Sequence, residues 1–196
     1  RAAREAGDGA MMRVFVGLAL PDEVVRTLTA AQAGLPAGRP VPPENLHLTI
    51  AFLGERPEPV VEDLHAALSR IAAPPVGLSL RGTGIFGGAR PRILYADVAE
   101  APGVGHLRRK VLTAAREAGI DTPRERFQPH VTLARLPREL PVEDVQRLEA
   151  FAVRRMDLAA GPVTIGAFAL FESHLKGDGA LYEVLAEYPL ERGEES

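Results

Sequence analysis

A four-residue pattern, His-x-Thr-x, occurs twice in the chain and limits its fold more than any other feature. The first copy is His47-Leu-Thr49-Ile and the second is His130-Val-Thr132-Leu. In both copies polar residues alternate with apolar ones, which is typical of β-strands with one buried face. Residues two apart on a strand point to the same side. The fold must therefore contain two strands that each present an imidazole and a hydroxyl on one face.

The elements around the two tetrads follow the same order, which predicts a duplicated architecture. Each copy runs helix, tetrad strand, helix and hairpin, and the copies span about residues 22–98 and 101–188. Aromatic residues recur at matching places in the two hairpins: Phe86, Tyr95, Phe171 and Tyr182. A period this long indicates two lobes rather than a solenoid of short repeats. We predict a bilobal α+β fold, with two antiparallel sheets facing across a central cleft and helices outside.

The boundaries of the expected elements follow from periodicity and from Pro and Gly breaks. We expect helices at 21–33, 57–71, 102–118 and 141–153. We expect strands at 13–20, 46–53, 76–86, 92–98, after Pro129, at 158–171 and at 181–188, the last two forming a long hairpin. Residues 13–190 then form one domain. Residues 1–12 are expected to be a disordered extension or to precede an alternative start, and 191–196 a tail.

Composition narrows the classes of partner and cofactor. The formal net charge of −3 argues against sequence-independent binding of long nucleic-acid duplexes, but it leaves room for a small anionic site. The absence of cysteine excludes disulfides, thiolate catalysis and cysteine-ligated metals. No apolar run approaches the ~20 residues of a membrane span, and no signal peptide is evident. We expect a cytoplasmic monomer with no membrane partner and no cofactor.

Two imidazoles on facing strands suit acid–base catalysis at neutral pH. Because free histidine has a pKa near ~6.5, one of His47 and His130 can be neutral while the other is protonated. Hydrolysis of a cyclic phosphodiester needs such a pair on opposite sides of phosphorus, one to activate water and one to protonate the leaving oxygen. Thr49 and Thr132 would donate hydrogen bonds to the non-bridging oxygens. No metal is needed for these steps.

Arg135 is a candidate for an added phosphate contact. It follows Thr132 by three residues, so on a regular strand it would face away from the threonine. A bulge or strand end near Ala134 would turn it back toward the phosphate. The remaining histidines are expected at the surface: His65, His106 and His174. We expect no metal site, since neither a His-Glu-x-x-His motif nor a compact third ligand is present.

Longer segments around the tetrads resemble one known family. The first is Pro43-Glu-Asn-Leu-His47-Leu-Thr49-Ile-Ala-Phe52-Leu-Gly54, and the second is Phe127-Gln-Pro129-His130-Val-Thr132-Leu-Ala-Arg135. Weaker matches are Arg13-Val-Phe15, Arg92-Ile-Leu-Tyr95, Ser173 and Gly179-Ala-Leu-Tyr182. Over about residues 13–190 the chain is similar to the two-histidine (2H) phosphoesterases, and most similar to the bacterial and archaeal RNA 2′,3′-cyclic phosphodiesterases, formerly called 2′-5′ RNA ligases.

This resemblance implies a bilobal α+β fold and hydrolysis of RNA 2′,3′-cyclic phosphate ends to 2′-phosphates. It implies that His47 is the proton donor and His130 the proton acceptor, an assignment that the symmetry of the motifs cannot make. It favours a bulge that turns Arg135 toward the phosphate, and it places Phe15 and Phe52 among the substrate-binding residues. Some relatives also catalyse weak, reversible 2′-5′ ligation.

Other functions remain open at this point. A 2H phosphodiesterase could act on another small cyclic phosphate, such as ADP-ribose 1″,2″-cyclic phosphate, or on a 2′-5′ oligonucleotide, and a substrate panel would separate these. A non-catalytic RNA-end-binding protein would be expected to have a degraded His-Thr pair in one lobe, whereas both pairs are intact. A metal-dependent phosphatase would be sensitive to chelators.

Overall fold

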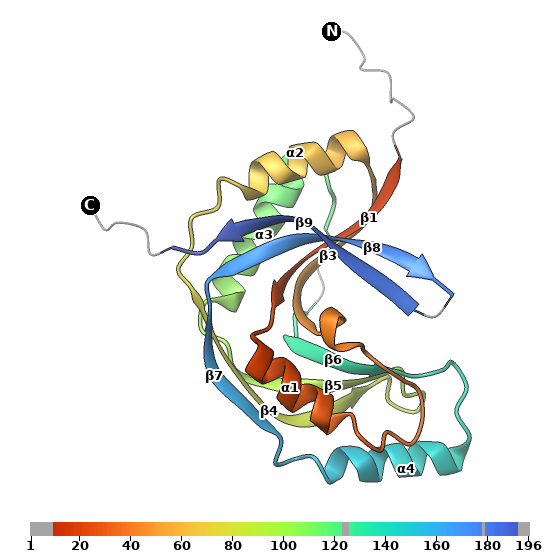
Figure 1. The fold of residues 1–196 in the computed structure, drawn as a ribbon. Coiled ribbons are helices and arrows are strands. Elements are labelled where there is room, and N and C mark those ends of the chain that lie inside the picture. Colours follow the sequence, from red (N-terminus) through yellow and green to blue (C-terminus); the bar gives the residue numbers. More distant parts are fainter. Residues whose placement is uncertain (1–9, 123–125, 178, 192–196) are drawn as a thin grey trace, which may run out of the picture.

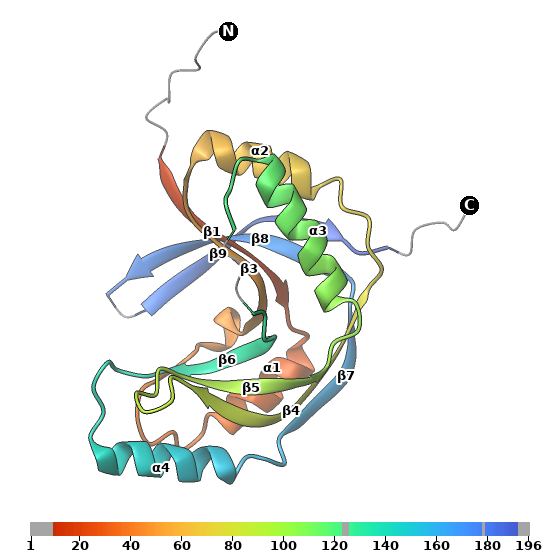
Figure 2. The same ribbon diagram turned by 180° about the vertical axis from the view of Figure 1, so that it is seen from behind.

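The strands of the computed structural model form one strongly curled antiparallel sheet (Figures 1 and 2). The structure describes residues 10–122, 126–177 and 179–191, so most of the expected extension (1–12) and most of the expected tail (191–196) lie outside the described residues, whereas Met11 and Met12 already belong to the first strand. The strands are β1 (Met11–Ala19), β2 (Arg39–Pro40), β3 (His47–Pro57), β4 (Val76–Phe86), β5 (Ile93–Glu100), β6 (His130–Arg135), β7 (Ala159–Ile165), β8 (Ala167–Lys176) and β9 (Gly179–Pro189). Their order is β7-β4-β5-β6-β3-β1-β8-β9, with β2 on β6.

The sheet consists of two arms that meet where β3 lies beside β6. The only paired residues between these strands are Leu48 and Val131. One arm contains β7, β4, β5 and β6, and the other contains β3, β1, β8 and β9. The predicted α+β class with antiparallel sheets is confirmed. The two expected sheets are the arms of a single sheet.

Each tetrad strand pairs within an arm that holds the other copy's hairpin. The β4–β5 hairpin follows β3 in sequence, but it pairs with β6. The β8–β9 hairpin follows β6 in sequence, but it pairs with β1, beside β3. The single strand expected at 158–171 was wrong, because the chain breaks at Gly166 into β7, which pairs with β4, and β8, which pairs with β1. The two arms are thus built from exchanged halves of the sequence.

The helices cover the two arms separately, as Figures 1 and 2 show. They are α1 (Asp22–Ala31), α2 (Glu58–Leu68), α3 (Val104–Glu117) and α4 (Val142–Val153), with a short 3₁₀ helix, η1 (Pro43–Asn45). Pro21, Pro57 and Pro141 precede three of them and supply backbone angles suited to a helix start, and acidic residues follow in the first turn. Helix α2 packs on β1 and β3 and helix α3 packs on β3, whereas α1 packs on β7 and α4 on β4.

Burial alternates along both tetrad strands as the sequence predicts. On β3, Leu48 and Ile50 are completely buried, and on β6, Val131 and Leu133 are completely buried. These side chains belong to the main hydrophobic core of the molecule. None of the described helices has the length and apolar character required to cross a membrane. The alternation leaves the histidines and threonines on the opposite face of the sheet, at the junction of the two arms.

Candidate active site

The four tetrad side chains lie on the two strands that join the arms. In both strands the burial sequence reads partly buried at His, buried, partly buried at Thr, then buried. The strands are antiparallel and Leu48 pairs with Val131, so His47 lies beside Thr132, and Thr49 lies beside His130. The structure therefore brings both sequence-predicted His-Thr pairs into one place, where each histidine neighbours the threonine of the other copy.

His47 is held by hydrogen bonds at both ring nitrogens. Nδ1 lies 2.7 Å from the backbone oxygen of Asn45. Because a carbonyl can only accept, Nδ1 carries a proton and donates it. Nε2 lies 2.9 Å from Oγ1 of Thr49, and in the neutral ring it accepts from this hydroxyl. The contact with Asn45 thus fixes the tautomer and leaves Nε2 as the hydrogen-bond acceptor of the neutral ring.

His130 repeats the same backbone arrangement. Its Nδ1 donates to the backbone oxygen of Gln128 across 2.9 Å. In both copies the carbonyl two residues before the histidine therefore binds Nδ1, so Nε2 is the nitrogen available to a ligand. His130 lines a pocket together with Thr49. Two equally oriented imidazoles are thus available on neighbouring strands.

Two amide side chains that the sequence reasoning missed connect these histidine segments to hairpin strands. Asn45 is buried, and its Nδ2 donates to the backbone oxygen of Ala180 on β9 across 2.6 Å. Gln128 Nε2 donates to the hydroxyl of Tyr95 on β5 across 3.4 Å. The signal was available in the sequence, because Asn or Gln stands two residues before the histidine in both copies. Each amide residue thus contacts the histidine with its backbone and a hairpin strand with its side chain.

Aromatic rings surround His47. The Phe15 ring centroid lies 4.8 Å from the imidazole, and Tyr182 stands edge-on to it at 5.2 Å. Phe15 in turn stacks on Phe171 with an angle of 8° between the rings. Phe15 has 1% of its surface exposed, so it packs against the imidazole from within the protein and lines neither of the two pockets beside the tetrads. Gly17 leaves room for this packing, since a Cβ there would lie 3.3 Å from His47 Cδ2.

A second set of rings lies beside His130. Phe86 is edge-on to the imidazole at 4.9 Å, and Phe86 stacks on Tyr95 with centroids 4.0 Å apart. The Tyr95 ring passes over Gly84, where a Cβ would lie only 2.4 Å from the phenol. The four aromatic positions that match between the sequence copies therefore all lie beside a tetrad histidine, Phe86 and Tyr95 at His130 and the others at His47.

The environment lowers the pKa of His47 to about 4. Desolvation by burial is the largest cause, because a charged imidazole loses its hydration there. The hydrogen bond to Asn45 acts in the opposite direction, while the positive charges of Arg135 and His130 add to the lowering. His47 is therefore neutral in the unliganded protein at pH 7, with Nε2 as an acceptor.

Arg135 reaches the His47 side of the site because β6 contains a bulge. On β5, Leu94 and Tyr95 are consecutive, but their partners on β6 are Ala134 and Thr132, so Leu133 is an extra residue. Without it, strand alternation would turn Arg135 away from the face that Thr132 occupies. Arg135 Nη2 instead lies 3.4 Å from the hydroxyl of Tyr182, to which it donates.

Two pockets flank the tetrads. One, of about 440 Å³, is lined by residues that include Thr49, Phe52, Phe86, Arg108, Phe127 and His130. The other, of about 350 Å³, is lined by residues that include Arg39, Asn45, Arg135, Leu181 and Tyr182. Phe52, which lines the first pocket, is 57% exposed, and Arg108 lies over the Phe127 ring at 4.4 Å. The tetrads are thus flanked by one pocket with aromatic surface and by another that contains two arginines.

The other three histidines lie away from this site. His65 and His106 are exposed, on α2 and α3. His65 Nδ1 is 2.8 Å from the Tyr188 hydroxyl. His174 is partly buried on β8 and contacts two glutamates. The structure therefore assembles only the two tetrad histidines at the junction of the arms.

The duplicated strands, the paired imidazoles and the curled α+β sheet define a two-histidine phosphoesterase. More particularly, the chain belongs to the LigT-like phosphoesterase family, because the family model described as "LigT like Phosphoesterase" matches residues 18–95 and 98–182. The two matched segments lie close to the two copies that the sequence predicts. The chain is thus an enzyme of the phosphoesterase class.

Individual relatives agree with this membership. A protein of Thermus thermophilus named RNA 2′,3′-cyclic phosphodiesterase is 38% identical over 93% of this chain and 92% of its own length. A protein of the same name from Aeropyrum pernix is 33% identical over 80% of this chain and 88% of its own. Among solved structures, E. coli LigT complexed with 3′-AMP superposes with a TM-score of 0.75 at 25% identity, covering 93% of this chain and 100% of that one. The protein TT0787 of Thermus thermophilus superposes with a TM-score of 0.74 at 33% identity, covering 91% and 98%.

Proposed function

We propose that this enzyme hydrolyses the 2′,3′-cyclic phosphate at RNA 3′ ends to a 2′-phosphomonoester, with no metal in the chemical step. The observation that carries the proposal is the pair of imidazoles at the junction of the arms, each with Nδ1 bound to a carbonyl and Nε2 as the reactive nitrogen. The relatives named RNA 2′,3′-cyclic phosphodiesterase and the LigT complex with 3′-AMP support the choice of substrate.

In the proposed reaction His130 is the proton acceptor and His47 the proton donor. His130 Nε2 removes a proton from water as the water oxygen bonds to phosphorus. The bond from phosphorus to O3′ breaks, and protonated His47 Nε2 transfers its proton to O3′. The 2′-ester bond is retained. Proton exchange with solvent then restores both rings. Each acid–base contribution of this kind is worth ~10²–10⁴-fold in rate.

The donor role requires that substrate binding protonates His47. In the free protein the pKa of His47 is about 4, and two of the causes are the nearby positive charges of Arg135 and His130. A bound phosphate is negative and counteracts both charges, so it favours the protonated imidazole. Thr49, which donates to the neutral ring, would then be free to turn toward the phosphate.

The threonines and Arg135 supply the remaining stabilisation. Negative charge develops on the non-bridging oxygens, where hydroxyl donors and a permanent cation act most strongly. Thr49, Thr132 and Arg135 provide these groups. Phe52 and the Phe86 and Phe127 rings offer stacking surface for a nucleobase. Since acid, base and cation are all present among the side chains, the reaction needs no Lewis acid.

The same displacement with a different nucleophile gives a reason to expect weak 2′-5′ ligation. When an RNA 5′-hydroxyl attacks in place of water, the same two proton transfers join the strands through a 2′-5′ bond. Microscopic reversibility allows the enzyme to cleave such a bond as well. The extent of ligation depends on whether the two pockets hold both strands, which a reaction with cyclic-ended and 5′-hydroxyl RNA would measure.

The decisive experiment combines purified protein with an RNA bearing a 2′,3′-cyclic phosphate, in the presence of EDTA. The terminal nucleotide of the product is released and compared chromatographically with authentic 2′- and 3′-nucleotides. The proposal predicts the 2′-phosphate. A 3′-phosphate product, or activity abolished by EDTA and restored by zinc, would overturn it. Tight binding of the RNA without turnover would favour an RNA-end-binding protein.

The same assay separates the alternative substrates. ADP-ribose 1″,2″-cyclic phosphate, a mononucleoside cyclic phosphate and a 2′-5′ oligonucleotide are compared with the RNA at equal concentration. The proposal predicts the highest kcat/KM for the RNA, because its terminal base and preceding nucleotide can occupy the two pockets. A higher value for ADP-ribose 1″,2″-cyclic phosphate would assign the site to small cyclic nucleotides.

A further inference from the structure

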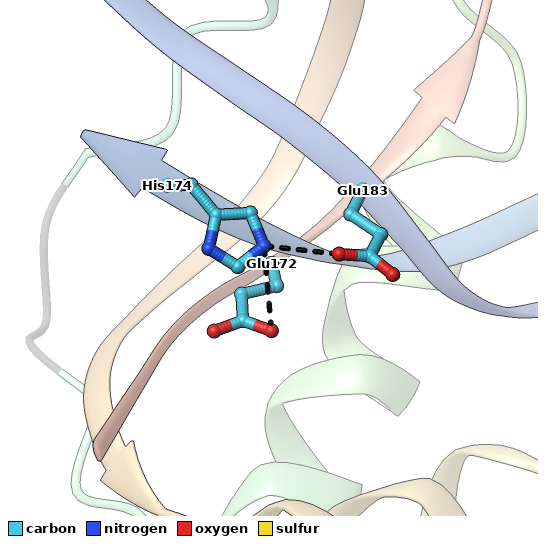
Figure 3. A group of neighbouring side chains, drawn as sticks. All are labelled: Glu172, His174 and Glu183. Atoms are coloured by element: carbon cyan, nitrogen blue, oxygen red, sulfur yellow. Dashed lines mark hydrogen bonds and ion pairs between the residues drawn. The ribbon is translucent and has the colours of Figure 1, made fainter. Parts of the chain in front are cut away.

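A second cluster of titratable side chains, Glu172, His174 and Glu183, lies on the β8–β9 hairpin (Figure 3). Glu172 and His174 are two apart on β8, and Glu183 is directly opposite Glu172 on β9. Their neighbours in sequence, Phe171 and Tyr182, contact His47. Because side chains alternate across a strand, the cluster is on the opposite face of the hairpin from the aromatic rings.

We propose that Glu172, His174 and Glu183 bind a divalent transition-metal ion of the Zn²⁺ type. Their ligand atoms all lie within 4.8 Å of one another. His174 Nε2 is 3.0 Å from a Glu183 oxygen and 3.7 Å from a Glu172 oxygen. Ligands of a tetrahedral zinc, at ~2.0–2.2 Å from the metal, are about 3.3 Å from each other. Both separations are therefore close to those of a zinc site, and water would complete the coordination.

The charges at the cluster also favour a cation. Two carboxylates directly opposite on neighbouring strands destabilise a sheet unless a positive charge lies between them. Among the side chains that the structure describes, the only ion pairs of Glu172 and Glu183 are with His174. The histidine offers at most one positive charge, whereas a divalent ion neutralises both carboxylates at once.

The mixed donor set selects the kind of ion. Imidazole nitrogen suits Zn²⁺ and its neighbours, whereas Ca²⁺ and Mg²⁺ prefer oxygen ligands alone. Glu172 has only 16% of its side chain exposed, so neighbouring atoms limit the space in which it can move. Glu183 is 63% exposed and can adjust to a bound ion. Affinity is expected to follow the general order for such sites, with Zn²⁺ bound more tightly than Mn²⁺.

The sequence did not reveal this group because its third member is on another strand. Glu172-x-His174 is a two-ligand pattern, and Glu183 joins it only when β8 and β9 pair. A metal bound here would connect the two strands of the hairpin that carries Phe171 and Tyr182. It would stabilise the side of the active site around His47 without touching the reacting atoms. This inference is independent of the proposed function.

The test measures Zn²⁺ binding by calorimetry on the full chain with His130→Ala, a variant that weakens any zinc binding at the tetrads. One site per chain is expected. His174→Gln in this background should weaken binding by at least about tenfold, as should Glu172→Gln. The matched control, His106→Gln, alters an exposed histidine on α3 and should leave affinity unchanged. Circular dichroism in metal-free buffer checks that each variant is folded.

Two further measurements test whether Zn²⁺ stabilises the β8–β9 hairpin. Zn²⁺ should raise the unfolding temperature of the His130→Ala protein and should slow amide exchange in β8 and β9. Both effects should disappear when His174→Gln is added. Equal Zn²⁺ affinity with and without His174 would overturn the proposal. Ca²⁺ bound as tightly as Zn²⁺ would also overturn it, because the two carboxylates alone would then account for binding.

Discussion

The two halves of the active site share a backbone arrangement and differ in their surroundings. In each half the carbonyl two residues before the histidine fixes Nδ1, a threonine follows two residues later, and an amide side chain reaches a hairpin strand. His47, however, lies among Phe15, Phe171 and Tyr182, and its Nε2 contacts Thr49. His130 lines an open pocket beside Phe86 and Tyr95.

In the proposed mechanism, this difference is what gives the two copies of one motif separate chemical roles. The local sequence sets the tautomer, which is the same in both halves. The long-range packing sets the affinity for protons, and it lowers the pKa of His47 to about 4. Acid–base catalysis with two groups works best when their environments differ, so that each ring has a defined state at each step. The following predictions test whether the difference in surroundings affects the catalytic rate and the pKa of His47.

The largest effect is expected when either imidazole is removed. His47→Ala and His130→Ala should each lower kcat by at least ~10², because each removes one proton transfer. Initial rates on a cyclic-ended RNA give the measurement, and His106→Ala on the surface of α3 serves as a control. Near wild-type activity in either variant would show that only one half is catalytic and that the duplicated motif is partly structural.

The second prediction uses proton binding at His47. Its pKa is lowered in the folded state, so between about pH 4 and 6.5 the unfolded chain binds more protons than the folded one. Folding therefore favours the neutral form of the His47 ring. The contribution of this neutral ring to the free energy of unfolding is fully present above pH 6.5 and is lost as the pH falls toward 4. His47→Gln should remove that part of the acid sensitivity, as measured by urea unfolding at several pH values, and His106→Gln should retain it.

The same titration tests the proposed donor role. In NMR spectra of the free protein, the His47 ring should titrate near pH 4, and inorganic phosphate should move the midpoint upward. If phosphate leaves the midpoint unchanged, His47 stays neutral with ligand bound and is better suited to accept a proton. The roles of the two histidines would then be exchanged. A bell-shaped dependence of kcat/KM on pH is expected in either case, and each histidine variant should lose one limb.

The sequence was sufficient for those features that depend on neighbouring residues. Alternation predicted that His47 and Thr49 share one face, as do His130 and Thr132, because a strand has a period of two wherever it is regular. Pro and Gly breaks, which are local signals, also located the four long helices of the part of the chain that the structure describes.

Features that depend on pairing between distant strands were out of reach. Both hairpins have similar sequences, so nothing local shows that β4–β5 pairs with β6 and β8–β9 with β1. The extra residue at Leu133 is visible only when β5 and β6 are aligned, so strand periodicity left the orientation of Arg135 undecided and only the family resemblance favoured a bulge. The unequal burial of His47 and His130 arises from this same packing, which is why the motifs look equivalent in sequence.

The third prediction concerns Arg135, whose positive charge acts on His47. Arg135→Lys keeps the charge but loses the planar fork of donors, and about tenfold lower kcat/KM is expected if Arg135 binds the phosphate. Because Arg135 also lowers the pKa of His47, Arg135→Gln should raise it, which NMR can measure independently of activity. Arg138→Lys is the matched control, since Arg138 lies beyond the end of β6 and lines a different pocket. Kinetics unchanged by Arg135→Lys would indicate that the bulge has a structural role only.

The smallest effects are expected at the amide side chains of Asn45 and Gln128. The ratio of their effects on kcat/KM compares how strongly each histidine depends on its hairpin. Asn45 is 6% exposed and donates to Ala180 across 2.6 Å, whereas the Gln128 contact with Tyr95 is 3.4 Å long. A hydrogen bond contributes ~0.5–1.5 kcal/mol, so Asn45→Ala should lower kcat/KM about tenfold and Gln128→Ala only about twofold. Both variants keep the backbone carbonyls that bind Nδ1. If Asn45 positions Tyr182 through β9, its loss should also shift the NMR titration of His47, which a general loss of stability would not do. An equal or larger effect of Gln128→Ala would contradict the comparison. It would mean that His47, although more buried, depends no more on the contact with its hairpin than His130 does.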